Sequence, residues 1–392
     1  MQKAVGMGVL SGSNRKLNPD AFITREEVCA VLHRAFLLED GGAAAQKFHD
    51  FDRISDWAKE AVSAMAAKGF IAGDSAGNVS AGNTITRAEF AQMMDNLVKG
   101  YPSGTAGGVI DGNAVVKAGG VLSGVTVKGD LILADGIGRD SIDLSGVMVE
   151  GRILVRGGSE VKLSGSTTAE SIAVAASAAV RNDTGRKFTN ISIEGSSANV
   201  TFTGAFGTVE VKADGVTVRA DSSASIDQVT TAVGGTTVEG SGTVKAVNVQ
   251  AGASGTKVTT QNTGITVAPG AGRVGSVNGS LEPGETGATD GLGRLEAEIK
   301  SDGQETDNTK KESNRPSGGR PSGGSNRTAY TVSGADGQPI GSFDSGTVLT
   351  VDPANGDRTY TVAVNGPVTL ETPIRSGYVF AGWMVSGTAI TA

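Results

Sequence analysis

The sequence contains few of the residues that usually build disulfide, metal or nucleophilic sites. It has one cysteine, Cys29, and only two histidines, His33 and His49. A single cysteine excludes a disulfide framework and a cysteine-based metal site. Two histidines leave little material for a histidine-ligated metal or a Ser-His-Asp triad. We therefore expect no metal, no cofactor and no catalytic residue, and we predict that Cys29, His33 and His49 are structural.

Long apolar runs and basic blocks are missing as well. No stretch approaches the roughly 18 consecutive apolar residues that a membrane span requires. The chain has 34 basic and 41 acidic residues, a net charge of −7, whereas a nucleic-acid binder would usually present a basic face. We expect neither a membrane span nor a nucleic-acid partner.

Aromatic residues are scarce and unevenly placed. Residues 1–101 contain eight of them, residues 102–329 three, and residues 330–392 six. A core with almost no aromatic side chains must be built from Val, Ile, Leu and Ala, which suits a narrow interior. Glycine is abundant, with 59 residues, but it does not recur at every third position, which excludes collagen.

The first hundred residues are internally repeated. The pattern Ile-Thr-Arg-x-Glu occurs at 23–27 and again at 85–89, and a Gly-rich pentapeptide at 8–12 is matched at 69–73. The second copy of the pattern follows the first by 62 residues. Such internal similarity indicates that the region is built from repeated structural units. Each unit is predicted to be a helix, a Gly-rich loop and a second helix.

The helix boundaries in this region follow from capping patterns. Thr24 with Glu27, and Thr86 with Glu89, have the spacing of a capping box. Gly69 is predicted to end the preceding helix, as a C′ glycine does. That preceding helix carries an apolar stripe of Trp57, Ala58, Ala61, Val62, Met65 and Ala66. The helix after Thr86 is predicted to bury Phe90, Met93, Met94 and Leu97.

The sequence pattern of the middle region predicts many short strands. Residues 124–133 align with residues 146–155, an offset of 22. Further short β-branched strands follow, separated by Gly, Asn, Asp and Ser. A turn length near 20 residues, short strands and an aromatic-poor interior predict a right-handed parallel β-helix over residues 109–280. The predicted strands are 171–174, 191–193, 200–202, 209–211, 216–218, 236–238, 244–249, 257–259 and 265–267.

The last region begins after a predicted flexible linker. Residues 282–328 are rich in Gly, Ser and charged residues, and Arg-Pro-Ser-Gly-Gly occurs twice in succession at 315–324. Alternating strands resume at Tyr330. We predict a small, truncated β-domain at 330–392.

The repeated region resembles S-layer homology (SLH) repeats of Gram-positive surface proteins. Residues 46–101 resemble one full repeat, from Phe-His-Asp at 48–50 through Gly-Phe-Ile-Ala-Gly at 69–73 to Ile-Thr-Arg-Ala-Glu at 85–89. Residues 1–45 resemble part of a preceding repeat. The family usually has three such units around a pseudo-threefold axis, so we expect the missing repeat sequence and a signal peptide upstream of Met1.

Two looser resemblances cover the rest of the chain. Residues 109–280 are similar in composition to the Gly-rich β-helical stretch that follows SLH repeats in some clostridial and bacillar surface proteins. Residues 373–383, with Gly-Tyr-Val-Phe-Ala-Gly-Trp at their end, resemble the Listeria–Bacteroides surface repeat, which is β-grasp-like. The predicted fold class is therefore multidomain: helical SLH repeats, a parallel β-helix, a linker and a β-grasp-like module.

The SLH resemblance implies a site for a pyruvylated secondary cell-wall polysaccharide, or another peptidoglycan-linked glycan. A guanidinium can donate two parallel hydrogen bonds to a carboxylate, and a helix N-terminus beside it adds positive potential. Alternatively, each arginine pairs with a carboxylate at a capping box, the tryptophan is a hydrophobic anchor, and the glycines only end a helix and form a turn. The candidate binding residues are Arg87, Arg25, Trp57, Gly69, Gly73 and Thr86.

The sequence favours a secreted, non-enzymatic protein of the cell wall or S-layer surface, with possible lateral self-association as a further expectation. One alternative is a wall-tethered β-helical lyase or hydrolase, which would need carboxylates clustered on adjacent turns. Another is an adhesin that binds its target through residues 330–392. The closest carboxylates in sequence are interpreted as turn formers: Asp130, Asp135, Asp140 and Asp143.

Overall fold

The computed structural model describes residues 2–12, 17–18 and 20–295, together with six short strands between Ala329 and Ile390. The chain divides into two compact units, Met1–Asp302 and Gly303–Ala392. Most of the predicted linker and β-grasp-like module lies outside the described residues, so both stay predictions. The strands of the second unit pair antiparallel: β23 Ala329–Ser333, β24 Pro339–Asp344, β25 Thr350–Val351, β26 Tyr360–Thr361, β27 Trp383–Val385 and β28 Thr388–Ile390.

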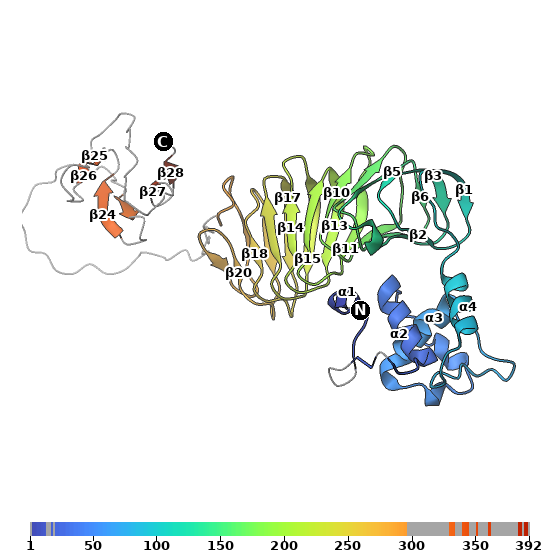
Figure 1. Ribbon diagram of the computed structural model, residues 1–392. Coiled ribbons are helices and arrows are strands. Elements are labelled where there is room, and N and C mark those ends of the chain that lie inside the picture. The colour runs from blue at the N-terminus through green and yellow to red at the C-terminus, as the bar shows by residue number, and fades with distance from the viewer. Residues whose placement is uncertain are drawn as a thin grey trace, which may run out of the picture. The chain divides into compact units, whose positions relative to one another are not determined.

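The first unit begins with helices and continues as a β-solenoid (Figure 1). Its helical part lies within residues 2–97 and contains four α-helices and three single 3₁₀ turns. The α-helices are α1 Gln2–Gly6, α2 Arg25–Phe36, α3 Lys59–Ala67 and α4 Arg87–Leu97, and the 3₁₀ turns are Ala44–Lys47, Phe51–Arg53 and Asp56–Ala58.

Both predicted capping boxes and the predicted helix end are confirmed. The Thr24 and Thr86 hydroxyls accept the backbone N–H groups of Glu27 and Glu89, whose carboxylates accept the threonine N–H groups in return. After α3, Gly69 has a φ of +71°. The Gly69 N–H donates to the carbonyl of Ala66, and the next N–H, that of Phe70, donates to the carbonyl of Met65. This pair of bonds is a Schellman motif, which needs the left-handed conformation that glycine adopts without strain.

The helices pack around a small aliphatic core. Cys29, Val62, Met65 and Leu97 are fully or almost fully buried in it. The prediction that α4 buries Phe90 is wrong, because that side chain is 42 % exposed. Met93 and Leu97, on the same stripe, are buried in the core as predicted, so only the first turn of α4 leaves its apolar residue exposed.

The middle region is a solenoid of about nine turns, and the predicted parallel β-helix is confirmed as a parallel solenoid. Its handedness stays a prediction. The first sheet contains β1 Thr105–Ile110, β3 Gly120–Val127, β5 Ser141–Ser145, β6 Met148–Val149, β8 Glu160–Ser164, β10 Ala178–Asn182, β12 Asn199–Thr203, β14 Thr217–Ala220, β16 Thr237–Gly240, β18 Lys257–Val258, β20 Val274–Gly275 and β21 Ser280–Leu281. The second sheet contains β2 Ala114–Val116, β4 Leu131–Leu133, β7 Arg152–Val155, β9 Ser171–Val174, β11 Phe188–Ile193, β13 Ala205–Val211, β15 Ser225–Thr231, β17 Thr243–Val249, β19 Gly264–Val267 and β22 Thr286–Ala288.

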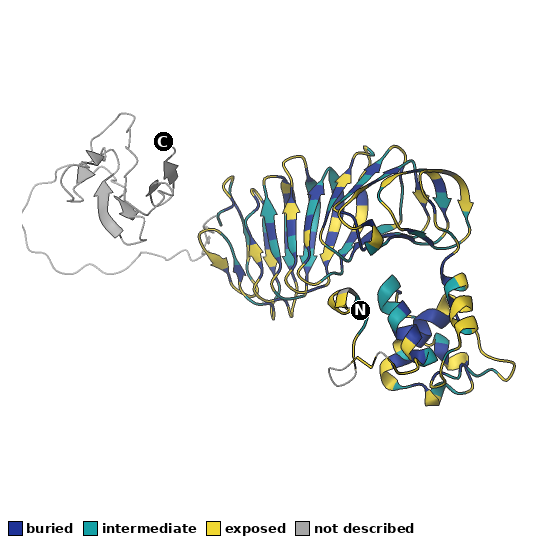
Figure 2. Ribbon diagram, in the orientation of Figure 1, coloured by how far each residue is buried: buried dark blue, intermediate teal, exposed yellow. Residues whose placement is uncertain are grey.

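The interior is made of aliphatic columns that run through the turns. Along strands such as β13 and β17 buried and more exposed residues alternate, as the pleat requires (Figure 2). Parallel pairing places each inward residue on its counterpart in the next turn. One column of the second sheet is Leu131, Ile153, Ile172, Ile191, Val209, Val229, Val247 and Ile265.

The 22-residue spacing predicted from the sequence holds at the start of the solenoid and again where β10 pairs with β12, but not throughout. Leu133 pairs with Val155, as predicted. Val155 then pairs with Val174, and Val174 with Ile193, so these turns are 19 residues long. The loops at the corners shorten while the strands stay in register.

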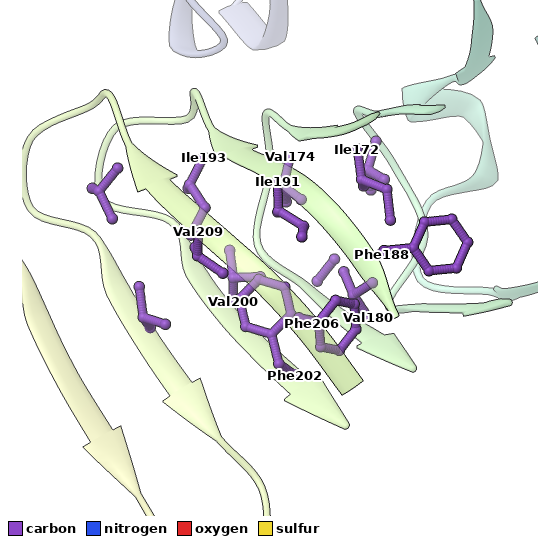
Figure 3. Packing of buried hydrophobic residues seen from close by; sticks show 14 of the residues in the cluster. Ile172, Val174, Val180, Phe188, Ile191, Ile193, Val200, Phe202, Phe206 and Val209 are labelled. Carbon is purple, nitrogen blue, oxygen red and sulfur yellow. The ribbon is translucent and has the colours of Figure 1, made fainter. Parts of the chain in front are cut away.

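The few aromatic residues of the solenoid lie inside it. The rings of Phe202 and Phe206 meet edge to face, with centroids 4.9 Å apart, and both are fully buried (Figure 3). Phe188 is 7 % exposed and belongs to the same core. These three side chains, on β11, β12 and β13, fill the interior of the solenoid at that level.

A chain reversal closes the far end of the solenoid. β21 pairs antiparallel with β20, and β22 pairs antiparallel with β19. Antiparallel strands stop the stacking of further turns and cover open edges. The linker predicted from residue 282 is therefore wrong in its first part, because residues 282–295 fold against the last turn.

The helical part packs against the outer face of the second sheet. Ile132, Leu154 and Ala173 point outward on successive strands, yet each is at most 4 % exposed, because Phe36 and Leu37 at the end of α2 cover them. The guanidinium of Arg156 also donates to the backbone carbonyl of Arg34.

We predict that Leu154→Ala weakens the attachment of α2 to the solenoid. Removing a buried leucine costs about 2–5 kcal/mol, and here the lost contacts lie outside the coil. Amide hydrogen exchange at residues 33–39 should become faster, while exchange in β9 to β13 stays unchanged.

Leu144→Ala is the matched control, because Leu144 is equally buried but faces the interior. It should lower the unfolding free energy of the solenoid itself. Unchanged exchange at residues 33–39 in Leu154→Ala would contradict the proposed attachment.

Candidate functional site

The two Ile-Thr-Arg motifs of the repeats lie side by side. Thr24 and Thr84 form an antiparallel bridge. The Ile85 N–H donates to the carbonyl of Ile23, and the Arg25 N–H donates to the carbonyl of Asn83, both at 3.0 Å. The N-termini of α2 and α4 are therefore tied together through the segments that precede them.

Arg25 is used inside the protein. Its side chain is only 14 % exposed, and Nη1 lies 2.8 Å from Oε1 of Glu89. Its Nε donates to the carbonyl of Val79 at 2.9 Å. The guanidinium thus joins the first repeat to the capping box and loop of the second. A ligand at Arg25 would have to displace these partners.

The capping box that receives Arg25 is held ionised. Glu89 accepts the backbone N–H and the hydroxyl of Thr86, both at 2.8 Å. These bonds, with Arg25 beside them, lower the pKa of the Glu89 carboxyl below its ordinary value. Thr86 therefore has a demonstrated structural role, as the N-cap of α4.

Arg87 occupies the corresponding position in the second repeat, but its surroundings differ. It is the first residue of α4, it is exposed, and it has no hydrogen bond or ion pair with any residue that the structure describes. The partners of Arg25 come from the repeat that follows it, whereas α4 is followed by the solenoid. Arg87 is consequently a free cation at a helix N-terminus, where backbone N–H groups add positive potential.

Exposed aromatic side chains accompany this cation. Phe90 lies three residues after Arg87, so the two share one face of α4. Trp57, elsewhere in the same repeat, is 56 % exposed. Exposed aromatic rings offer apolar faces to a ligand beside the charged group.

The Gly-rich loop of the second repeat satisfies most of its own backbone. Asp74 accepts the N–H groups of Ala76 and Asn78, each at 2.9 Å, and the bond from Asn78 is the main reason that the Asp74 pKa is lowered. A Cβ at Gly73 would lie 3.1 Å from the backbone of Gly77. Gly69 and Gly73 therefore have shown structural roles, as a helix end and a tight turn.

Asp50 ties the end of this loop to the start of its repeat. Its two carboxylate oxygens accept the N–H groups of Val79 and Ser80, both at 2.8 Å. Sequence reasoning gave Asp50 no role, although its place in the Phe-His-Asp segment marked it as part of the repeat.

Cys29 and His49 have structural surroundings. Burial raises the pKa of the Cys29 thiol to about 12, so it stays protonated and unreactive at neutral pH. The Nδ1 of His49 lies 2.7 Å from the carbonyl of Ala76. Among the residues that the structure describes, no three His, Cys, Asp or Glu side chains gather as metal ligands. No helix in the same residues is both long and apolar enough to cross a membrane.

Two of the four carboxylates considered for catalysis, Asp130 and Asp143, pair with the next turn of the solenoid. Asp130 accepts two bonds from the guanidinium of Arg152 and one from its backbone N–H. Asp143 accepts bonds from Lys162 and Ser164. These contacts link successive turns.

Sequence reasoning missed a different carboxylate pair, on β13 and just after β11. Lys212 lies 3.4 Å from both Glu194 and Glu210 and forms an ion pair with each. The paired strands bring these glutamates to adjacent turns, which a one-dimensional search for clustered carboxylates does not detect.

Comparison with known proteins agrees with the repeat geometry. Residues 1–29 and 47–91 match the S-layer homology domain family. Exoglucanase XynX of Acetivibrio thermocellus is 30 % identical over 103 residues, which are 25 % of this chain and 10 % of that protein. The amylopullulanase of Thermoanaerobacterium thermosulfurigenes is 29 % identical over 103 residues, 25 % of this chain and 6 % of that protein.

A third relative is a surface protein by name. The surface-layer 125 kDa protein of Lysinibacillus sphaericus is 42 % identical over 57 residues, 14 % of this chain and 5 % of that protein. The chain thus spans a tenth or less of the length of these relatives. No solved structure matches it. The helical region at the N-terminus of this chain consists of S-layer homology sequence, and a β-solenoid follows it.

Proposed function

We propose that the S-layer homology repeats hold this protein non-covalently on the cell wall, by binding an acidic, pyruvylated secondary polysaccharide. One observation carries the proposal: Arg87 is an exposed guanidinium at the N-terminus of α4 without a partner among the described residues. The parallel N–H donors of a guanidinium fit the two oxygens of a carboxylate, such as that of a pyruvyl ketal. The exposed ring of Phe90 offers an apolar contact to the sugar that carries it.

Arg25 serves in this proposal as the structural counterpart of Arg87. It keeps the two motifs in contact by bonding Glu89 and Val79. The surface-layer relative, which matches over 57 residues, supports a location on the cell surface. The protein is then a secreted component of the wall or S-layer, held by its first hundred residues.

The solenoid acts in this proposal as a non-enzymatic stalk that displays the residues after it. Its turns are tied by cross-turn ion pairs, such as Asp130 with Arg152. The ion pairs of Lys212 with Glu194 and Glu210 argue against the free acid and base that a glycosidase needs. Binding of a target by residues 330–392 is compatible with this role, and it stays a separate proposal.

We predict that Arg87→Ala weakens binding of the full chain to purified, pyruvylated cell wall. Loss of a charge-assisted hydrogen bond costs about 1.5–3 kcal/mol, roughly a ten- to hundredfold loss of affinity. Binding by the unaltered chain should also weaken as salt rises, because mobile ions screen exposed charges. A wall co-sedimentation assay over a range of sodium chloride concentrations measures both effects.

Arg25→Ala is the matched control. It should lower thermal stability of the helical region by removing the bonds to Glu89 and Val79, with unchanged affinity per folded molecule. Arg87→Ala should leave stability nearly intact. Equal binding of the unaltered chain to walls stripped of pyruvyl ketals would overturn the recognition of charge.

We predict that the full chain releases no new reducing ends from uronate-containing or neutral glycans. Lys212 forms ion pairs with both carboxylates of the adjacent-turn pair, so a substrate would have to compete with it for them. A reducing-sugar assay with the unaltered chain and with Glu210→Gln tests this. Cleavage that disappears in Glu210→Gln would establish the hydrolase alternative instead.

A further inference from the structure

One outward-facing column of residues on the second sheet changes from apolar to polar along the solenoid. Its first four members are apolar and lie under the end of α2: Val115, Ile132, Leu154 and Ala173. Its next five members are polar: Ser192, Glu210, Thr230, Asn248 and Thr266. The helical part therefore covers the apolar turns and stops where the polar turns begin.

A hollow of about 410 Å³ lies at this change. Leu37, Leu38 and Glu39, which follow α2, line one side of it, and the polar side chains of β9, β11 and β13 line the other. Such a volume is within the range of small-ligand sites, roughly 300–1,000 Å³. The hollow exists because α2 ends there: Leu37 has a φ of +44° and turns the chain across the sheet.

The floor of the hollow presents unused hydrogen-bonding groups. The side chains of Asn190, Ser192 and Thr208 have no hydrogen-bond partner among the described residues. Asn190 and Thr208 are paired on adjacent strands, about 4.8 Å apart. Hydroxyl and amide groups both donate and accept, which suits ligands that do the same.

The charges around the hollow select against anions. Its lining contains Glu39, Glu194 and Glu210 but only two cations, Arg152 and Lys212. Arg152 is already bonded to Asp130, and Lys212 to the two solenoid glutamates. Glu39 has no ion pair among the described residues. An anionic polymer would meet excess negative charge here, whereas an uncharged one would not.

We propose that this hollow is a second glycan site, which binds an uncharged, hydroxyl-rich oligosaccharide lying across β9, β11 and β13. The site differs from the one at Arg87 in place and in charge preference, and the inference does not depend on that proposed function. The free groups of Asn190, Ser192 and Thr208 bond the sugar hydroxyls, and the residues after α2 close one side.

Titration calorimetry of the full chain with two neutral probes, cellotetraose and N-acetylchitotetraose, tests the proposal. In the Arg87→Ala chain, which lacks the proposed wall site, at least one should bind and tetragalacturonate should not. Thr208→Lys places a long side chain in the hollow and should lower the association constant at least tenfold. Asn190→Ala removes one amide without blocking space and should lower it about three- to tenfold, the scale of a lost hydrogen bond.

Thr217→Lys is the matched control, because Thr217 is a partly exposed strand residue of the first sheet, away from the hollow. It should leave neutral-glycan binding unchanged, and so should Arg87→Ala, which separates this site from the wall site. The proposal is overturned if neither neutral probe binds at millimolar concentration. It is equally overturned if Thr208→Lys and Thr217→Lys bind a probe alike.

Discussion

Each turn of the solenoid is hydrogen-bonded along its strands to the turn before it, and the parallel register of these bonds governs the rest of the unit. Because every residue lies over its counterpart, side chains of one kind accumulate into columns. Inside, the column from Leu131 to Ile265 fills a coil too narrow for many aromatic rings. On the outer face the same register aligns four apolar residues, and the end of α2 packs against them. The polar residues of the following turns are aligned in a continuous row. The packing of the helical part and the floor of the hollow thus have one cause.

The two arginines of the repeated motif illustrate how neighbouring structure assigns a role. Arg25 and Arg87 occupy equivalent positions just after N-cap threonines, in nearly identical sequence. Arg25 is followed by another repeat, whose Glu89 and Val79 take its guanidinium. Arg87 is followed by the solenoid, and its guanidinium remains available. A residue that stabilises one repeat junction becomes a candidate ligand group where the repeats end.

Charge divides the unit into regions with different preferences. At α4 the free cation and the helix N-terminus attract anions. On the solenoid, carboxylates outnumber cations in the hollow, and the cations there are already paired. Other ion pairs of the solenoid, such as those of Lys187 and Lys245 with Asp227, connect nearby turns. Two sites of opposite preference would let one chain hold an acidic polymer and an uncharged glycan at the same time.

The sequence by itself determined the local features. These features depend on residues that are close together in the sequence or on a strict period. They are the capping boxes, the glycine at the end of α3, the aliphatic strands and the pairing of leucine with valine in the first turns. Sequence reasoning missed strands such as Ser225–Thr231, whose polar residues hide their alternation, and it misjudged Phe90. Only the tertiary structure decided which arginine is free, because the partners of Arg25 lie more than fifty residues away. The hollow and the glutamates beside Lys212 likewise arise from pairing between turns. Turn lengths vary, and a change of one residue would move every outward group, so no single spacing in the sequence predicts them.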